Sequence, residues 1–274
     1  MLRKKRFALN RMICPNLDLE QFFRLANELG LNKVELRNDL AGSKILDDCS
    51  PVEANALADH MGIEIITINA IQQFNLPAAW DRVVEDVNRM AATARAIGCP
   101  GIVLCPNNDV EDRRTPQAFY QDTVTALDRL APIFEESGIA GLVEPLGFEE
   151  CSLRSKDIAV NAIKAAAGDG YRLVHDTFHH HIGPDENLQV AYTGLVHISG
   201  VDADLPSVQW RDPHRVLVDG SDKLLNLEQI KALLDRGYNG DFSFEPFSEN
   251  VHQMNIESLK SAIEESIIYI ADNV

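Results

Sequence analysis

The feature that most constrains the fold of this sequence is a regular alternation of short apolar runs with longer amphipathic segments. Eight runs rich in β-branched residues predict buried strands, near residues 6–10, 33–37, 62–70, 101–105, 138–144, 171–176, 194–199 and 241–246. Between them, apolar residues recur at three- and four-residue spacing, which predicts helices. Glycines typical of helix C-termini stand before several of the strands: Gly30, Gly62, Gly98, Gly138 and Gly237.

Eight strand–helix repeats predict an α/β fold of the (β/α)8 TIM-barrel type, because right-handed crossovers between parallel strands favour closing such a sheet. The length of 274 residues suits one barrel, and no linker or shift in composition interrupts it. We therefore expect a single domain over residues 1–274. An open doubly wound sheet is the alternative, but "LNRMICPN" follows the first strand where a glycine-rich nucleotide fingerprint would stand.

The charge balance narrows the range of partners. With 25 Lys and Arg against 42 Asp and Glu, the net charge of −17 disfavours binding to nucleic acid and to anionic membranes. No signal-peptide core or membrane-length apolar run is present, and five scattered cysteines without a CxxC pair indicate reduced thiols. We expect a cytoplasmic protein that acts on a small molecule, with homo-oligomerisation left open.

Four consecutive strand runs, the fifth to the eighth, close on side chains that can bind a metal: Glu144, Asp176, His197 and Glu245. In a parallel barrel the carboxyl ends of the strands meet at the mouth, where substrates bind. A Glu ending one strand is more often part of an ion pair, and a lone His is more often a core residue. Four such endings together favour a site for one divalent ion, Mn²⁺, Mg²⁺, Co²⁺ or Zn²⁺.

Histidines cluster around the end of the sixth strand. His179, His180 and His181 follow one another in what we interpret as a loop, and at least one of them is expected to be merely solvated. His175 precedes Asp176, so the alternation of a strand points it to the opposite face, beneath the helices. Residues 200–225 are long for a strand-to-helix loop, which is typical of a functional loop.

Several motifs together carry a resemblance to a known family. They read "VELR" (34–37), "INAIQQFN" (68–75), "VEPLGFEECSL" (143–153), "DTFHHHIG" (176–183), "VHISGVDADLP" (196–206), "HRV" (214–216) and "FSFEPF" (242–247). Over nearly its whole length the chain resembles the xylose-isomerase-like TIM barrels of sugar isomerases and epimerases. The third-strand motif and the second His of the "FHxH" pattern are similar to the branch that contains the inosose isomerases.

The resemblance implies roles for individual residues. Glu144, Asp176, His197 and Glu245 match the metal ligands of the family, and Glu144 and Glu245 also match its catalytic pair of carboxylates on either side of the substrate. The substrate-binding residues that it implies are His179, Arg215, Asn69 at the end of the third strand, and His181.

The activity implied is that of a metal-dependent isomerase that moves a ketone by proton transfer through an enediolate. For the inosose branch the substrate is 2-keto-myo-inositol, an intermediate of inositol catabolism. After Arg215, however, the chain reads "VLVDGSDKLLNL" where many members have Pro-Gly-x-Gly, so the rim of the pocket differs.

Four other functions were considered, of which two stay open and two are disfavoured. The same residues would serve an isomerase or epimerase of another small ketose or of hydroxypyruvate, or an inosose dehydratase, which is a lyase. A metal-dependent abasic-site endonuclease needs more histidines and a basic face, so it is disfavoured. A non-catalytic sugar-binding barrel is disfavoured because all four ligand candidates are present.

Overall fold

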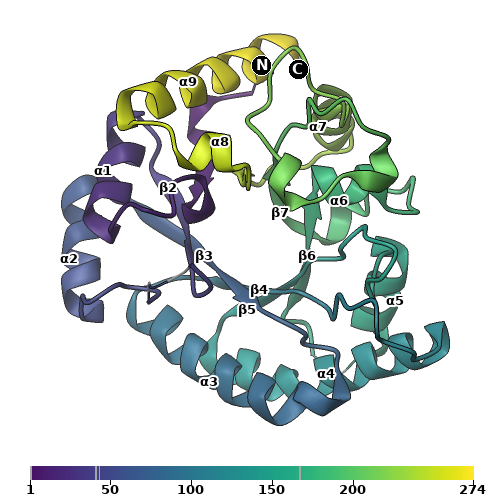
Figure 1. Cartoon of the computed structure of the whole chain (residues 1–274). Helices are drawn as coiled ribbons and strands as arrows, with labels where there is room; N and C mark the ends of the chain where they lie inside the picture. The colour runs from purple at the N-terminus through teal and green to yellow at the C-terminus, as the bar shows by residue number, and fades with distance from the viewer. Residues whose placement is uncertain (1, 41, 43, 167) are drawn as a thin grey trace. The chain divides into compact units, whose positions relative to one another are not determined.

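The computed structural model describes residues 2–40, 42, 44–166 and 168–274 (Figure 1). Within them, eight parallel strands form a closed barrel in chain order, which confirms the predicted fold class. The strands are β1 (Phe7–Asn10), β2 (Lys33–Arg37), β3 (Glu64–Ile71), β4 (Gly101–Leu104), β5 (Ala140–Val143), β6 (Tyr171–Asp176), β7 (Thr193–Ile198) and β8 (Phe242–Phe244). Each lies within two residues of the predicted bounds.

The helices begin and end where local chemistry favours it. They are α1 (Leu19–Glu28), α2 (Pro51–Met61), α3 (Trp80–Ala96), α4 (Pro116–Ser137), α5 (Lys156–Ala165), α6 (Thr177–Ile182), α7 (Asn226–Asp235), α8 (Glu249–His252) and α9 (Ile256–Asn273). Asp18 and Ser50 open α1 and α2 as capping boxes, in which the cap side chain accepts the N–H of the third helical residue. Among the described residues, no helix is long and apolar enough to span a membrane.

The chain divides into two compact units. One comprises Met1–Ile66 with Val196–Val274, and the other comprises Thr67–Leu195. Both boundaries fall inside strands, in β3 and in β7.

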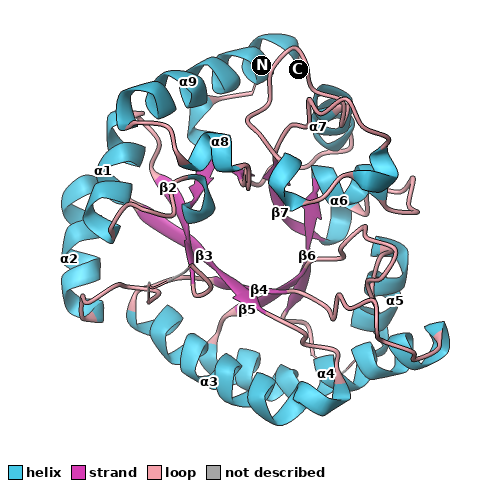
Figure 2. Cartoon of the chain, viewed as in Figure 1, coloured by secondary structure: helices cyan, strands magenta, loops and turns pink. Residues whose placement is uncertain are grey.

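The first unit contains β1, β2, β8 and the second half of β7. Strand β1 pairs with β2 on one side and with β8 on the other, and β8 also pairs with β7. The register places Asn10 opposite Glu35 and His197 opposite Ser243. In Figure 2, helices α1 and α2 lie on the outer side of β2. Because Ser243 pairs with Ala8, the pair of His197 and Ser243 lies two residues before the level of Asn10 and Glu35 along β1.

The second unit contains β4, β5, β6 and most of β3. Strand β5 pairs with β4 on one side and with β6 on the other. Helices α3, α4 and α5 run along the outer side of these strands, each packed against the next (Figure 1). Because strands of a parallel sheet are covered on both faces, they read as continuous apolar runs rather than as alternating ones.

Large aromatic side chains pack against one another in the cores of both units. In the first unit, Phe7 stacks on Phe244 with ring centroids 5.6 Å apart. In the second, the Tyr171 ring packs edge-on against Phe134, and its hydroxyl donates to the carbonyl of Leu127 at 2.6 Å. The cysteines, which all lie in the described part of the chain, are free thiols, as predicted.

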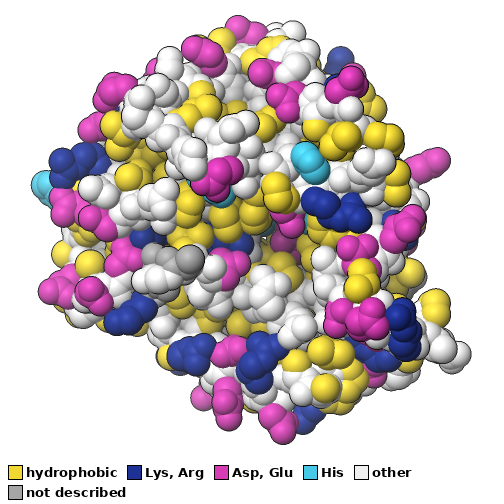
Figure 3. Space-filling view, viewed as in Figure 1, with side chains coloured by type: hydrophobic (Ala, Val, Ile, Leu, Met, Phe, Trp, Pro, Cys, Tyr) yellow, Lys and Arg dark blue, Asp and Glu magenta, His cyan; other side chains and the backbone are white. Residues whose placement is uncertain are grey.

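Charged side chains of both signs are mixed on the surface of the second unit. Over α3 and α4, in the lower part of Figure 3, basic and acidic side chains lie next to one another. On α3, for example, Asp86 forms ion pairs with Arg82 at 3.2 Å and with Arg89 at 2.6 Å. Exposed pairs of this kind stabilise a helix by only about 0.5 kcal/mol each.

Gly138 tests the role of the helix-terminating glycines. It follows α4 with a φ of +68°, and a Cβ built there would meet no atom within 4 Å. Gly138→Ala should therefore destabilise the protein through backbone strain alone, by about 1 kcal/mol. Gly220 is the matched control, because its φ lies outside the left-handed region and a Cβ would come no closer than 3.9 Å, to Tyr269.

For Gly220→Ala we expect a neutral or slightly stabilising effect, of about 0.5 kcal/mol, from a less flexible unfolded chain. Urea unfolding of both variants measures the difference. Equal midpoints for the two would contradict this account of Gly138.

Candidate metal and substrate site

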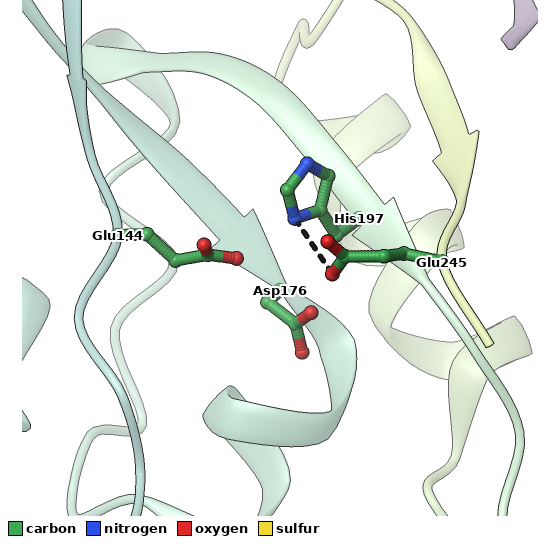
Figure 4. Close-up of side chains that lie close together, drawn as sticks. All are labelled: Glu144, Asp176, His197 and Glu245. Atoms are coloured by element: carbon green, nitrogen blue, oxygen red, sulfur yellow. Dashed lines mark ion pairs between the residues drawn. The ribbon is translucent and has the colours of Figure 1, made fainter. Parts of the chain in front are cut away.

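In the first unit, His197 and Glu245 form a buried pair. His197 is the penultimate residue of β7, and Glu245 directly follows β8. The imidazole is 0% exposed, and its Nδ1 lies 3.2 Å from Oε2 of Glu245, the contact dashed in Figure 4. Both residues were predicted as ligands, and the structure brings them into contact.

Glu245 is surrounded by cations and donors. Its Oε1 accepts from Nη1 of Arg37 at 2.6 Å and from Nδ2 of Asn10 at 3.1 Å, and its Oε2 accepts from Nη2 of Arg215 at 3.1 Å. Burial by itself would raise the pKa of this carboxyl, but His197, Arg215 and Arg37 outweigh it and hold the pKa well below its usual range. The side chain is thus a fixed anion at neutral pH.

The other nitrogen of the His197 ring meets a second carboxylate. Oε2 of Glu35, in β2, lies 3.2 Å from Nε2 of the ring. Glu35 is 0% exposed, and its Oε1 accepts from Nδ2 of Asn10 at 3.3 Å. Burial would raise the pKa of Glu35, but the adjacent His197 more than offsets this and lowers it. His197 therefore lies between two carboxylates.

Sequence reasoning assigned no role to Asn10, Glu35 or Arg37. The signal was present, since "KVELR" places Glu35 and Arg37 two residues apart on one face of a strand predicted to be buried. Arg37 donates to Glu245 and, through Nε and Nη2, to Asp39 at 2.7 Å each. Burial would lower the pKa of Arg37, but Asp39 and Glu245 raise it further above its ordinary value.

Arg215 is held by the long segment after β7, which folds back on itself. Gly200 and Val216 exchange backbone hydrogen bonds of 2.7 and 2.8 Å. Arg215 then donates through Nε to the hydroxyl of Ser199 at 2.9 Å, while its guanidinium stacks 4.6 Å above the Phe247 ring. These contacts hold the guanidinium of Arg215 in place, and a functional role for residues 200–225 stays a prediction.

The part of that segment which departs from the family pattern is anchored in the fold. Val218 is buried, and its carbonyl accepts from the hydroxyl of Ser266 in α9 at 2.6 Å. Asp222 accepts from the N–H groups of Val201, Leu224 and Asn226 at 3.2, 3.1 and 2.9 Å. The altered sequence is thus held in place by hydrogen bonds at Val218 and at Asp222.

In the second unit, Glu144 and Asp176 form the other carboxylate pair. Glu144 directly follows β5, and Asp176 is the last residue of β6 (Figure 4). Both are buried, and their ligand atoms lie within 4.8 Å of each other. The thiol of Cys105 lies 3.6 Å from Oε2 of Glu144 as a donor. Two buried carboxylates this close favour a cation beside them.

Asp176 also starts the helix that presents the histidines. Its Oδ1 accepts from the N–H of His179 at 2.9 Å, as an N-cap does. The expectation of a histidine loop was therefore wrong, because this cap allows residues 177–182 to form α6. Three consecutive histidines do not by themselves predict a helix. The signal in the sequence is Asp176, a residue type typical of a helix N-cap, directly before residues 177–182.

The predicted substrate residues of the second unit occupy different positions. His179 is buried, and its Nδ1 accepts from the N–H of Gly147 at 3.2 Å, which leaves Nε2 as the protonated nitrogen of a neutral ring. His181 is half-buried and, two residues further along α6, faces away from His179. Asn69 is buried but does not end its strand, because β3 continues to Ile71.

A polar cluster lies behind β6. Lys156, the first residue of α5, places its Nζ 3.1 Å from Nδ1 of His175 and 2.7 Å from Nδ1 of His180. His175 is fully buried under α5, as predicted. Burial lowers the pKa of Lys156 to about 7, and burial together with Lys156 lowers the pKa of His180 to about 3. This cluster joins the end of β6 to α6.

Most of the chain matches a known family of barrels. A model of the family described as xylose isomerase-like TIM barrel matches residues 23–272. The chain therefore belongs to the xylose isomerase-like TIM barrel family. Among its relatives is the inosose isomerase of Halalkalibacterium halodurans, 24% identical over 256 residues, which cover 90% of this chain and 89% of that protein.

Solved structures agree with this assignment. A xylose isomerase domain-containing protein from Salmonella typhimurium LT2 is 35% identical, with 99% of each chain covered and a TM-score of 0.91. The IolI protein, crystallised with a zinc atom, is 20% identical, with 98% of this chain and 99% of that chain covered and a TM-score of 0.88. The similarity to the IolI protein is evidence for the fold alone.

Lys156 generates a prediction about stability and pH. Its pKa in the folded state is about 7 against an ordinary value of 10.5, so between these values the unfolded chain binds the extra proton and stability rises with pH. Relative to Lys156→Met, the wild type should gain at least about 1 kcal/mol of unfolding free energy from pH 7 to pH 10.

Denaturant unfolding of both proteins at several pH values measures this gain. Lys164→Met, at an exposed lysine of the same helix, is the control and should follow the wild-type profile. A constant difference between wild type and Lys156→Met across this range would show that Lys156 titrates normally.

Proposed function

We propose that this protein is a divalent-metal-dependent isomerase of a small ketose or cyclitol ketone, with 2-keto-myo-inositol as its substrate. Membership of the xylose isomerase-like family and the inosose isomerase relative support a sugar isomerase or epimerase. The inosose substrate, and with it a place in inositol catabolism, is the finer part of the proposal. This finer part is based on the name of the relative and on the histidine motif of residues 178–181.

The observation that carries the proposal is the donor set of Glu144, Asp176, His197 and Glu245. All four are buried. The ligand atoms of Glu144 and Asp176 lie within 4.8 Å of each other in one unit, and those of His197 and Glu245 lie within 4.8 Å of each other in the other unit (Figure 4). Three carboxylates and one imidazole are mostly hard ligands, which suit Mn²⁺, Co²⁺, Mg²⁺ or Zn²⁺. They fit a single ion that keeps coordination positions for substrate oxygens. The zinc of the IolI protein, which has the same fold, is consistent with this choice.

The proposed chemistry is proton transfer between neighbouring carbons. When bound, a divalent ion would supply a positive charge that stabilises developing negative charge on the substrate carbonyl. A carboxylate of the pair Glu144 and Glu245 removes the C–H proton from the hydroxyl-bearing carbon next to the carbonyl, and a carboxylate of the same pair returns a proton to the former carbonyl carbon. The hydroxyl proton passes to the former carbonyl oxygen, so the hydroxyl-bearing carbon becomes the ketone and the ketone migrates by one position.

Other residues would orient the substrate. Nε2–H of His179 and the guanidinium of Arg215 are donors suited to substrate oxygens. Asn69 and His181 remain in the proposal as further substrate contacts, although His181 points away from His179 on α6. The buried surroundings of His179, Arg215 and Asn69 strengthen each hydrogen bond that they make.

Proton NMR of 2-keto-myo-inositol in D₂O, with the metal-loaded protein, tests the proposal. A shifted ketone isomer is the expected product, and it should fail to form after chelation of the metal. Loss of water instead would mean a dehydratase. An unchanged substrate in the presence of a metal-loaded protein would exclude this ketone, and a panel of ketoses and hydroxypyruvate would then identify the substrate.

Glu245→Gln provides a residue-level test. The variant keeps the size of the side chain but removes the charge that faces His197, Arg37 and Arg215, so turnover should fall at least about 100-fold, as for other general acid–base groups. Circular dichroism should show a folded barrel. Glu249→Gln, at an exposed position of α8, is the control and should retain wild-type activity. Near-normal turnover by Glu245→Gln would remove Glu245 from the mechanism.

A further inference from the structure

We infer that Glu35 is a positioning residue that determines which nitrogen of His197 faces the metal ligands. The inference rests on the metal site of the proposed function. It gives a role to a residue that lies in the "VELR" motif but that the sequence analysis left without one and that is not among the ligands. Its role is to act on the metal through His197, without touching the metal or the substrate.

The geometry around the imidazole carries the argument. Nε2 of His197 lies 3.2 Å from Oε2 of Glu35, while Nδ1 lies 3.2 Å from Oε2 of Glu245, on the opposite side of the ring. An ionised carboxylate can only accept a hydrogen bond, and a neutral imidazole has one donor and one acceptor nitrogen. With Nε2–H donated to Glu35, Nδ1 is left as the nitrogen that can bind a cation beside Glu245.

Glu35 is itself held firmly in place. It is 0% exposed in β2, and the register of the sheet puts it opposite Asn10 of β1. Nδ2 of Asn10 donates to Glu35 at 3.3 Å and to Glu245 at 3.1 Å. Asn10 thus links the two carboxylates on either side of His197, so that the ring has one orientation available.

A purely structural role for Glu35 is the competing explanation. A buried carboxylate costs free energy unless it is paired, and replacement of a buried ionic pair by apolar groups is often neutral or stabilising. Stability alone therefore gives no reason for a carboxylate at this position. Carboxylates that accept the second N–H of a metal-binding histidine are common, and their removal typically lowers metal affinity by about 10- to 100-fold.

The test is titration of metal-free protein with Co²⁺, followed by visible absorption, for the wild type, Glu35→Gln and Glu35→Ala. Glu35→Ala removes the acceptor and should lose about 10- to 100-fold in affinity. Glu35→Gln keeps an oxygen acceptor at the same place, so its Co²⁺ affinity should fall less. This variant also keeps the test usable if the alanine variant does not fold. Glu64→Gln, at an exposed carboxylate, is the control for a change of charge and should bind as the wild type does.

A second readout follows the histidine directly. Long-range ¹H–¹⁵N spectra of the zinc-loaded wild type should show His197 protonated at Nε2, and this signal should be lost or shifted in Glu35→Ala. Unchanged Co²⁺ affinity in both Glu35 variants, or a proton on Nδ1 in the loaded wild type, would overturn the inference while leaving the metal site intact. A wild type that binds no Co²⁺ would overturn the proposed metal site, and the role of Glu35 with it.

Discussion

The interaction on which the rest of the site depends is the burial of the Glu245 carboxylate among cations. This side chain is 3% exposed, so its charge requires partners within the fold. Arg37, Arg215 and His197 supply them from β2, from the segment after β7 and from β7 itself. Each of these elements must therefore be in register before Glu245 can be buried.

That requirement explains the local structure around the site. The guanidinium groups of Arg37 and Arg215 both lie over the ring of Phe247, at 5.5 and 4.6 Å, so one aromatic side chain supports both partners of Glu245. The backbone of Arg215 adds to this, because its carbonyl accepts from the N–H groups of Phe247 and Ser248 at 3.0 and 2.8 Å. Charge pairing and chain geometry thus reinforce each other, which is what a preorganised site needs.

Much of the fold could be predicted because it depends on local pattern. The strands are continuous apolar runs and several helices end on glycine, and both signals were read correctly. The errors were those of local detail. Asn69 does not end β3, since the apolar run continues to Ile71, and the histidines form a short helix because Asp176 caps it. In the second case the deciding contact involves a backbone group, the N–H of His179, which a count of residue types does not show.

The sequence by itself determined the alternation of strands and helices, and it placed Glu144, Asp176, His197 and Glu245 at successive strand ends. Only the tertiary structure decided which groups surround them. Asn10, Glu35 and Arg37 lie more than 150 residues from His197 in the chain, and the pairing of β1 with β2 and β8 aligns these elements. The physical reason is that hydrophobic periodicity is local, whereas pairing of a buried charge depends on strand register across the sheet.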